Sequence, residues 1–171
     1  RLFLFPTTST SFYRHERGWK KVYSRELLAR ERKKIKSAFK EVFSKLSYKH
    51  PKKVYGPVVE DRGTQITFSA VGQRAPVHVK AKWNRDSDIR PRLIRALQNH
   101  ISGFEIRRGG LTSIDVTRKG IDKAYGVRQI VRELKIPIKD LLFVGDALYP
   151  GGNDYAARRT GVECVQVSGP A

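Results

Sequence analysis

The pattern of apolar and polar positions predicts β-structure at the start of the chain. Residues 2–5 form an apolar run, and residues 11–14 and 19–23 are short, partly apolar segments that flank a turn at residues 17–18. Short segments of this kind, bounded by turn residues, are typical of strands. We therefore predict one strand followed by a hairpin.

A long helix is expected to follow, with Ser24 as its N-cap. Its apolar positions keep helical spacing and would form one buried stripe: Leu28, Ile35, Phe39, Val42, Phe43 and Leu46. The alternating segment 65–69 predicts a strand, and residues 77–79 a second β stretch.

A second helix is expected after a cap at residues 86–88, with Ile89, Leu93, Ile94, Leu97 and Ile101 on one face. Gly103 would end this helix, and strands are predicted at 104–107 and 111–116. Residues 24–117 therefore read as a compact α+β unit.

The pattern changes from Gly120 onward. A helix with apolar residues at helical spacing leads to the apolar strand 141–144, a glycine-rich loop, a short helix from Asn153 and a strand at 162–167. Strands that are apolar on both faces and alternate with helices indicate a parallel α/β sheet covered on both sides.

Composition narrows the class of protein. With 39% hydrophobic residues among 171, the chain can bury a core and is not of a disordered class. The single cysteine, Cys164, excludes a disulfide framework and a cysteine-based zinc site. No apolar run approaches the roughly 20 residues that span a bilayer, so no membrane partner is predicted and a cytoplasmic location is expected.

The net charge of +19 predicts affinity for anions. Residues 1–60 carry a net +11, residues 61–120 a net +7 and residues 121–171 a net +1. Nucleic acid, with Tyr48 and Tyr55 stacking on bases, is one partner that this basic region would suit. A solvated polar surface is the alternative, because charge alone produces non-specific binding to polyanions.

The segment 144–154, Val-Gly-Asp-Ala-Leu-Tyr-Pro-Gly-Gly-Asn-Asp, contains the most informative chemistry. Asp146 comes directly after a buried strand and Asp154 begins the next helix. Ligands of open α/β sheets bind at this edge, and carboxylates are preferred by Mg²⁺. Alternatively, both aspartates are turn and N-cap residues.

Lys123 is the second clue, because it lies in the first turn of a predicted helix. A cation at this position opposes the helix dipole and favours a nearby anion, such as a phosphate. A solvent-facing lysine is the alternative.

Together these motifs resemble the haloacid dehalogenase superfamily, in its phosphomannomutase-like, Cof-type (class IIB) phosphatase branch. The resemblance covers essentially the whole chain and is carried by five segments: Phe5-Pro6 with the following hairpin, Glu60-Asp61-Arg62-Gly63 leading to Gln65–Phe68, Gly109–Val116, Gly120–Ala124 and Gly145–Asp154. It implies an α/β Rossmannoid parallel-sheet core, formed by residues 1–23 and 118–171, with residues 24–117 inserted as an α+β cap domain.

The resemblance also implies roles for individual residues. Asp146, Asn153 and Asp154 match the loop that binds Mg²⁺, and Lys123 matches the catalytic lysine that offsets charge at the phosphoryl group. In the cap, Arg62 matches an arginine that contacts substrate phosphate. Ser113 and Asp115 match residues that face the hydroxyls of a phosphorylated sugar.

The sequence departs from this family at its defining motif. It contains no Asp-x-Asp-x-Thr, whose first aspartate is the nucleophile. We therefore expect an N-terminally truncated chain, inactive alone, whose missing core strands come from upstream residues or another chain. Where the mutases have a cap arginine, the sequence reads Gly72-Gln73, with Arg74 one place later, and the loss of this phosphate contact favours a phosphatase over a mutase. A catalytically dead relative whose basic cap binds nucleic acid or a ribonucleoprotein is the alternative function.

Overall fold

The computed structural model describes residues 2–169, which divide into two compact units. One unit combines the two ends of the chain, with inner bounds at Arg25 and Gly120, and we call it the two-segment unit. The other is the inserted unit, Glu26–Lys119. These bounds lie within two residues of those expected from the sequence. No helix among residues 2–169 is long and apolar enough to cross a membrane.

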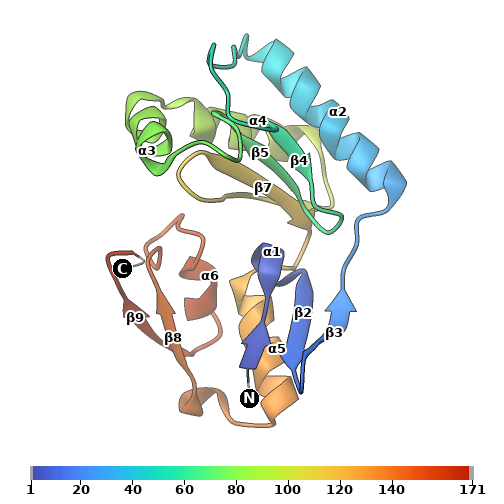
Figure 1. Ribbon diagram of the computed structural model, residues 1–171, viewed down its shortest axis with the longest axis vertical. Helices are drawn as coiled ribbons and strands as arrows, with labels where there is room; N and C mark the ends of the chain where they lie inside the picture. The colour runs from blue at the N-terminus through green and yellow to red at the C-terminus, as the bar shows by residue number, and fades with distance from the viewer. Residues whose placement is uncertain (1, 170–171) are drawn as a thin grey trace. The chain divides into compact units, whose positions relative to one another are not determined.

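The N-terminal part of the two-segment unit is a small antiparallel sheet (Figure 1). Its elements are β1 (Leu2–Leu4), α1 (Pro6–Ser9), β2 (Ser11–His15) and β3 (Trp19–Ser24), with strand order β1-β2-β3. Phe12 on β2 anchors it, because this buried ring stacks on Phe5 at 4.3 Å and meets the edge of Phe3. The predicted strand and hairpin are confirmed.

The C-terminal part of this unit contains α5 (Lys123–Leu134), a 3-10 turn η1 (Ile138–Asp140), β8 (Leu142–Gly145), α6 (Tyr155–Arg158) and β9 (Glu163–Gln166). Strands β8 and β9 are parallel, as predicted, with Val144 opposite Val165. On one face Phe143 packs against Val127 and Ala157, which lie on α5 and α6. On the other face Leu142, Val144 and Val165 remain exposed. The predicted covering of both faces is therefore absent within residues 2–169.

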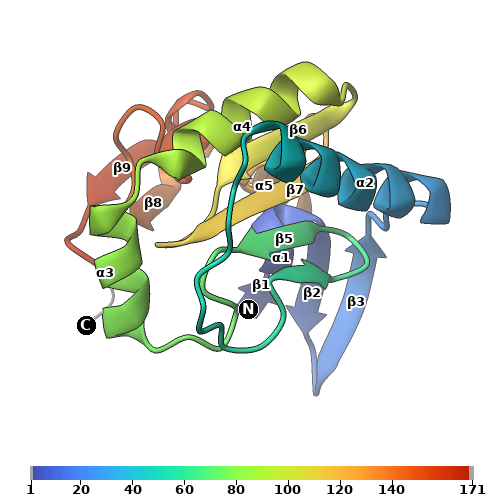
Figure 2. The same cartoon turned by 90° about the horizontal axis from the view of Figure 1, so that it is seen from above.

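The inserted unit is a four-stranded antiparallel sheet with two long helices on one face (Figure 2). Its elements are α2 (Ala29–Lys45), β4 (Val59–Asp61), β5 (Ile66–Ser69), α3 (Val77–Asp86), α4 (Ile89–His100), β6 (Phe104–Arg108) and β7 (Ser113–Arg118), with strand order β4-β5-β7-β6. Alternation along each strand sends Phe68, Ile114 and Ile106 to the helices, where they form the core with Phe39 and Leu97. The opposite face of this sheet is polar.

The first long helix begins later than predicted. Ser24 is the last residue of β3, and the helix starts at Ala29. Other hydrogen bonds hold the backbone between Ser24 and Ala29. The Arg25 amide donates to the carbonyl of Thr10, and the Leu27 amide donates to the carbonyl of Gly63. Tertiary contacts thus replace the expected N-cap.

The predicted β stretch at 77–79 is wrong, because these residues open helix α3. Pro76, with φ of −57°, occupies the N-cap position. The valines at 77 and 79 suggested strand alternation, whereas the segment follows helical geometry. Similarly, the short helix expected from Asn153 begins at Tyr155.

Candidate functional site

The loop between β8 and α6 holds the carboxylate of Asp154 against its own backbone. The Asp154 amide donates to the carbonyl of Ala147 (3.2 Å), and its Oδ2 accepts a hydrogen bond from the Ala147 amide (3.3 Å). Asp154 is only 5% exposed. These contacts fix the carboxylate beside the segment that carries Asp146.

Two glycines make this packing possible. A Cβ on Gly145 would lie 2.6 Å from Oδ2 of Asp154, and a Cβ on Gly152 would lie 2.1 Å from the carbonyl oxygen of Ala147. Neither distance is compatible with a side chain. The glycines of this loop are therefore required by close approach of the carboxylate and the backbone.

Lys123 and Asp154 are brought together, although they are far apart in the sequence. The Lys123 Nζ lies 3.5 Å from Asp154 Oδ1. Lys123 is the first residue of α5, whose N-cap, Asp122, accepts a hydrogen bond from the Tyr125 amide (2.9 Å) and pairs with Arg159. A buried carboxylate thus provides the anion that a lysine in this first turn favours.

The loop also offers oxygen atoms that could bind a cation. Asp146 is exposed at the end of β8, and the side-chain oxygen Oδ1 of Asn153 is buried without a hydrogen-bond partner among the described residues. Carboxylate and amide oxygens are the donors that Mg²⁺ prefers. Residues 2–169 contain no cluster of three or more His, Cys, Asp or Glu side chains suited to a metal. The side chains of Asp146 and Asn153 offer oxygen donors, which is the ligand type that Mg²⁺ takes.

The other predicted site residues lie on the polar face of the inserted unit's sheet. A cross-strand row runs through all four strands, because Glu60 pairs with Thr67, Thr67 with Asp115, and Asp115 with Arg107. Ser113 lies two residues from Asp115 on the same face of β7. The structure thus places Ser113 and Asp115 together.

Asp115 is the end of a chain of hydrogen bonds. Gln65 donates to Thr67 Oγ1 (2.7 Å), which donates to Asp115 Oδ1 (2.8 Å). Burial raises the pKa of Asp115, although the Thr67 hydrogen bond and the charge of Arg62 act against this rise. A Cβ on Gly109 would lie 2.7 Å from Oδ2 of Asp115, so the second oxygen is tightly packed too.

Arg62 lies directly after β4 and is oriented by two neighbours. Its Nε donates to Glu60 (2.7 Å) and its Nη2 donates to Gln73 Oε1 (3.3 Å). The Nε2 of Gln73 is buried without a hydrogen-bond partner in the described part of the chain. The side chain of Gln73, at the position where an arginine was expected for a mutase, thus contacts Arg62.

Several residues of these two clusters could not be recognised from motifs. The roles of Gln65 and Thr67 were not predicted, because the sequence analysis places both only in a strand, and Ala147 contributes only its backbone. The alternation of Gln65, Thr67 and Ser69 along β5 was the available signal, because it places three polar side chains on one face. Tyr48 was expected to be free for stacking and is not, because it packs against Phe43 and Phe68.

Comparison with known proteins supplies the family. The model of the eukaryotic phosphomannomutase family matches residues 3–165. The chain belongs to this family. It is 30% identical over 105 residues to phosphomannomutase 1 of Dictyostelium discoideum and 29% identical over 105 residues to the phosphomannomutase of Saccharomyces cerevisiae. Each match covers 58% of the chain, but only 41% and 40% of those relatives.

Solved structures show the same fold at low sequence identity. The IMP-nucleotidase of Plasmodium falciparum matches 98% of the chain and 45% of its own, with a TM-score of 0.60 and 16% identity. The sucrose-phosphatase of Synechocystis matches 96% and 58%, with a TM-score of 0.54 and 14% identity. The predicted fold class, an α/β haloacid dehalogenase-like core with an inserted α+β unit, is confirmed.

Proposed function

We propose that the protein containing this chain transfers phosphoryl groups on a sugar phosphate through an aspartyl-phosphate, with Mg²⁺ as cofactor. Family membership supports the reaction class. The observation that carries the proposal is the ion pair of Lys123 with the buried Asp154 beside Asp146.

Lys123 would act on the transferring group by charge. Its ammonium is held by a carboxylate that is fastened to the loop, yet 36% of the side chain remains exposed. A preorganised cation at this place stabilises the negative charge that develops on phosphoryl oxygens. Lys123 is therefore assigned as the catalytic residue of this chain.

Asp146, Asn153 and Asp154 would hold Mg²⁺. Asp146 and the unpartnered Asn153 oxygen offer direct donors, whereas both oxygens of Asp154 already have protein contacts. We therefore assign Asp154 to orienting Lys123 and the loop as well as to the metal. The ion, when bound, would neutralise charge between the nucleophile and the phosphoryl group.

The polar face of the inserted unit would bind the substrate. Asp115 and Ser113 offer hydrogen-bonding groups for sugar hydroxyls, and Arg62 offers a guanidinium for a phosphate. Gln73 contacts Arg62 at the position where a second arginine was expected, so Arg62 lacks that neighbouring arginine. The other arginine of this cross-strand row, Arg107, is paired with Glu105. One phosphate contact suits a phosphatase, in which water completes the reaction, better than a mutase that must hold a phosphate at either end of the sugar.

The nucleophile and its strand are proposed to come from outside these 171 residues. Among residues 2–169, β1 pairs only with β2, and β8 pairs only with β9. Leu2 and Leu4 are 59% and 50% exposed, and Leu142 and Val144 are 59% and 55% exposed. Unpaired edges with apolar side chains favour pairing with a further strand. Upstream residues or another chain would supply this strand.

Four measurements test the proposal. The chain alone, assayed with Mg²⁺ and hexose phosphates, is expected to show no turnover, and robust phosphate release would contradict the external nucleophile. In the full-length protein, Lys123→Met should lower kcat by roughly 100-fold or more. Lys119→Met is the matched control, because Lys119 is exposed and lies outside both clusters.

Product analysis separates the two reactions. Free phosphate indicates a phosphatase, and interconversion of 1- and 6-phosphates indicates a mutase.

Hydrogen exchange tests the missing strand. The backbone amides of β8 that do not bond to β9 should exchange rapidly in the chain alone and slowly in the full-length protein. Equal exchange in both would contradict the external strand.

A further inference from the structure

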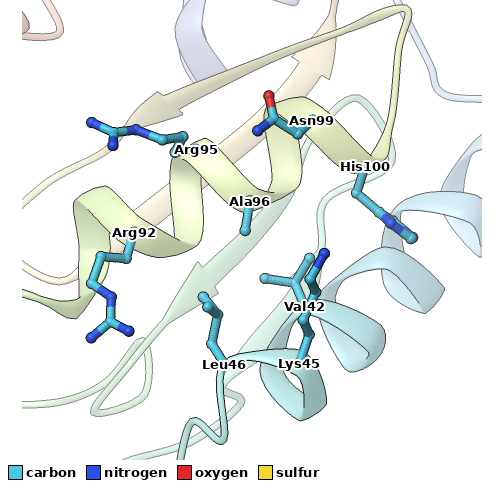
Figure 3. Close-up of a pocket in the computed structure, with 8 residues that line it drawn as sticks. All are labelled: Val42, Lys45, Leu46, Arg92, Arg95, Ala96, Asn99 and His100. Atoms are coloured by element: carbon cyan, nitrogen blue, oxygen red, sulfur yellow. The ribbon is translucent and has the colours of Figure 1, made fainter.

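A groove lies between helices α2 and α4 of the inserted unit, on the layer that covers the apolar face of the sheet (Figure 3). Its volume is about 330 Å³. The groove is lined by Val42, Lys45 and Leu46 from α2 and by Arg92, Arg95, Ala96, Asn99 and His100 from α4. It is separate from the polar sheet face, because the two helices occupy the opposite face.

Helical spacing explains how the groove acquires an apolar floor and a cationic rim. Arg92, Arg95 and Asn99 are three and four residues apart, which places them along one side of α4. Ala96 points toward α2, where it meets Val42 and Leu46 (Figure 3). Val42 is anchored in the core, so the floor is rigid.

The cations of the rim have no carboxylate partners. Among the ion pairs of the described residues, Lys45, Arg92 and Arg95 take part in none. The carboxylate of Glu41, the acid beside the groove, lies 2.9 Å from Nε2 of His100, which is charged only when protonated. Two acids elsewhere in the inserted unit have local partners, because Glu31 pairs with Arg118 and Asp61 pairs with Lys36. The positive charge at the groove is therefore available to a ligand.

The basic surface extends well beyond the groove. The inserted unit has 22 basic and 9 acidic residues, a net charge of +13. Exposed cations outside ion pairs continue on α2 and the segment after it: Arg30, Lys33, Lys40, Lys49, Lys52 and Lys53. This distribution suits a linear polyanion rather than a small ligand, and repulsion disfavours a second copy of the chain.

We infer that the groove between α2 and α4 binds a single-stranded nucleic acid. The guanidinium groups of Arg92 and Arg95 and the ammonium of Lys45 would contact successive phosphates. The aliphatic floor formed by Val42, Leu46 and Ala96 would receive the apolar face of one base. A base is available for such contact only in a strand whose bases are not paired, which favours single strands over duplexes.

Salt dependence measures the phosphate contacts. For a single strand, each phosphate contact lowers the logarithm of the binding constant by roughly 0.7 per tenfold increase in salt concentration. Three contacts therefore account for about 18-fold loss of affinity between about 50 and about 200 mM salt. We would titrate the chain with a fluorescent single-stranded RNA of about 12 nucleotides, a length within known site sizes. The triple variant Lys45→Gln, Arg92→Gln, Arg95→Gln should lose about 18-fold less affinity over this range than the wild type.

A matched triple variant controls for net charge. Arg17→Gln, Arg108→Gln, Lys119→Gln removes the same number and types of charge from exposed positions outside the groove. It should keep a salt dependence steeper than that of the groove variant. Equal salt dependence of the two triple variants would overturn the assignment to the groove.

A substitution at an exposed position tests the groove without disturbing the core. Asn99→Glu adds a carboxylate to the rim and should weaken RNA binding by about tenfold or more, whereas Asn99→Gln should leave it within about twofold. Circular dichroism of each variant verifies folding. Equal affinity of the Glu and Gln variants would contradict the proposal.

Competitors identify the chemistry of the ligand. Single-stranded RNA and DNA of one sequence should compete alike, because the proposed contacts are to phosphates and a base face. Duplex DNA and polyglutamate should compete at least about tenfold less well per charge. Competition by either as strong as that of the single strands would show that charge alone governs binding, and would overturn the proposal.

Discussion

The ion pair between Lys123 and Asp154 can be tested by its contribution to the free energy of unfolding. At the observed 3.5 Å, two unit charges in a medium of effective dielectric constant about 20 interact by about 4.7 kcal/mol. The Asp154 side chain is 7% exposed but that of Lys123 is 36% exposed, so solvent screens part of this energy. We expect a coupling energy of about 2 kcal/mol, between the values for exposed and buried pairs.

A double-mutant cycle isolates this coupling. The cycle uses Lys123→Met, Asp154→Asn and the double variant, with urea unfolding followed by fluorescence. Trp19 lies in the same unit as the pair, and a Trp83→Phe background removes the tryptophan of the inserted unit. The two single variants should each destabilise this unit, and the double variant should cost about 2 kcal/mol less than their sum.

A pair in the same unit serves as the control. Lys20 and Glu16 lie at a similar distance, 3.4 Å, but their side chains are 67% and 45% exposed. Their coupling should be about 0.5 kcal/mol or less. If the coupling of Lys123 with Asp154 also falls below about 0.5 kcal/mol, the burial of Asp154 does not strengthen the pair, and the reasoning about the loop is refuted.

Three further predictions concern backbone packing and a buried acid. Gly151→Ala should destabilise the two-segment unit by about 1 kcal/mol, because φ of Gly151 is +84° although the space around it is open. Gly152→Ala should destabilise it by about 3 kcal/mol, because the added Cβ would clash with a backbone carbonyl. Urea unfolding measures both free energies. Burial raises the pKa of Asp115, so its contribution to stability is present at low pH and is lost as pH rises from about 4 through its raised folded pKa. Asp115→Asn should therefore have a larger free energy of unfolding than the wild type only above about pH 4. An equal increase in the free energy of unfolding at pH 3 would contradict the raised pKa of Asp115. Ser9→Gly should raise the thermal stability of the two-segment unit by about 1 kcal/mol, because φ of Ser9 is +69°, and an unchanged Tm would argue against strain there.

The elements that the sequence predicted well are those specified by local signals. The hairpin of β2 and β3 follows from a turn between two short segments, and α4 follows from apolar residues at helical spacing. The start of α2 was missed because the Leu27 amide finds its partner at Gly63, which no local pattern indicates. Helix α3 was missed because Val77 and Val79 have strand propensity, and their environment decided otherwise.

The candidate site shows the same division between local and distant signals. The loop from Gly145 to Asp154 could be recognised, because its glycines and carboxylates are close together in the sequence. The hydrogen bond from Thr67 to Asp115 joins residues 48 positions apart on different strands, so its existence depends on register. Register is set by the whole sheet rather than by either segment. The roles of Gln65 and Thr67 therefore required the structure.

The distribution of apolar surface bears on how complete each unit is. The core cluster of the inserted unit contains 14 buried apolar residues among those described, whereas that of β8, α5 and α6 contains three. Of the 14 large apolar side chains that are exposed among residues 2–169, ten belong to the two-segment unit, which is the smaller of the two. Burial of apolar area provides the main stabilisation of a fold, at about 25 cal/mol per Å². The two-segment unit would therefore gain more than the inserted unit from a further strand, which agrees with the proposal that its nucleophile lies on a strand outside these residues.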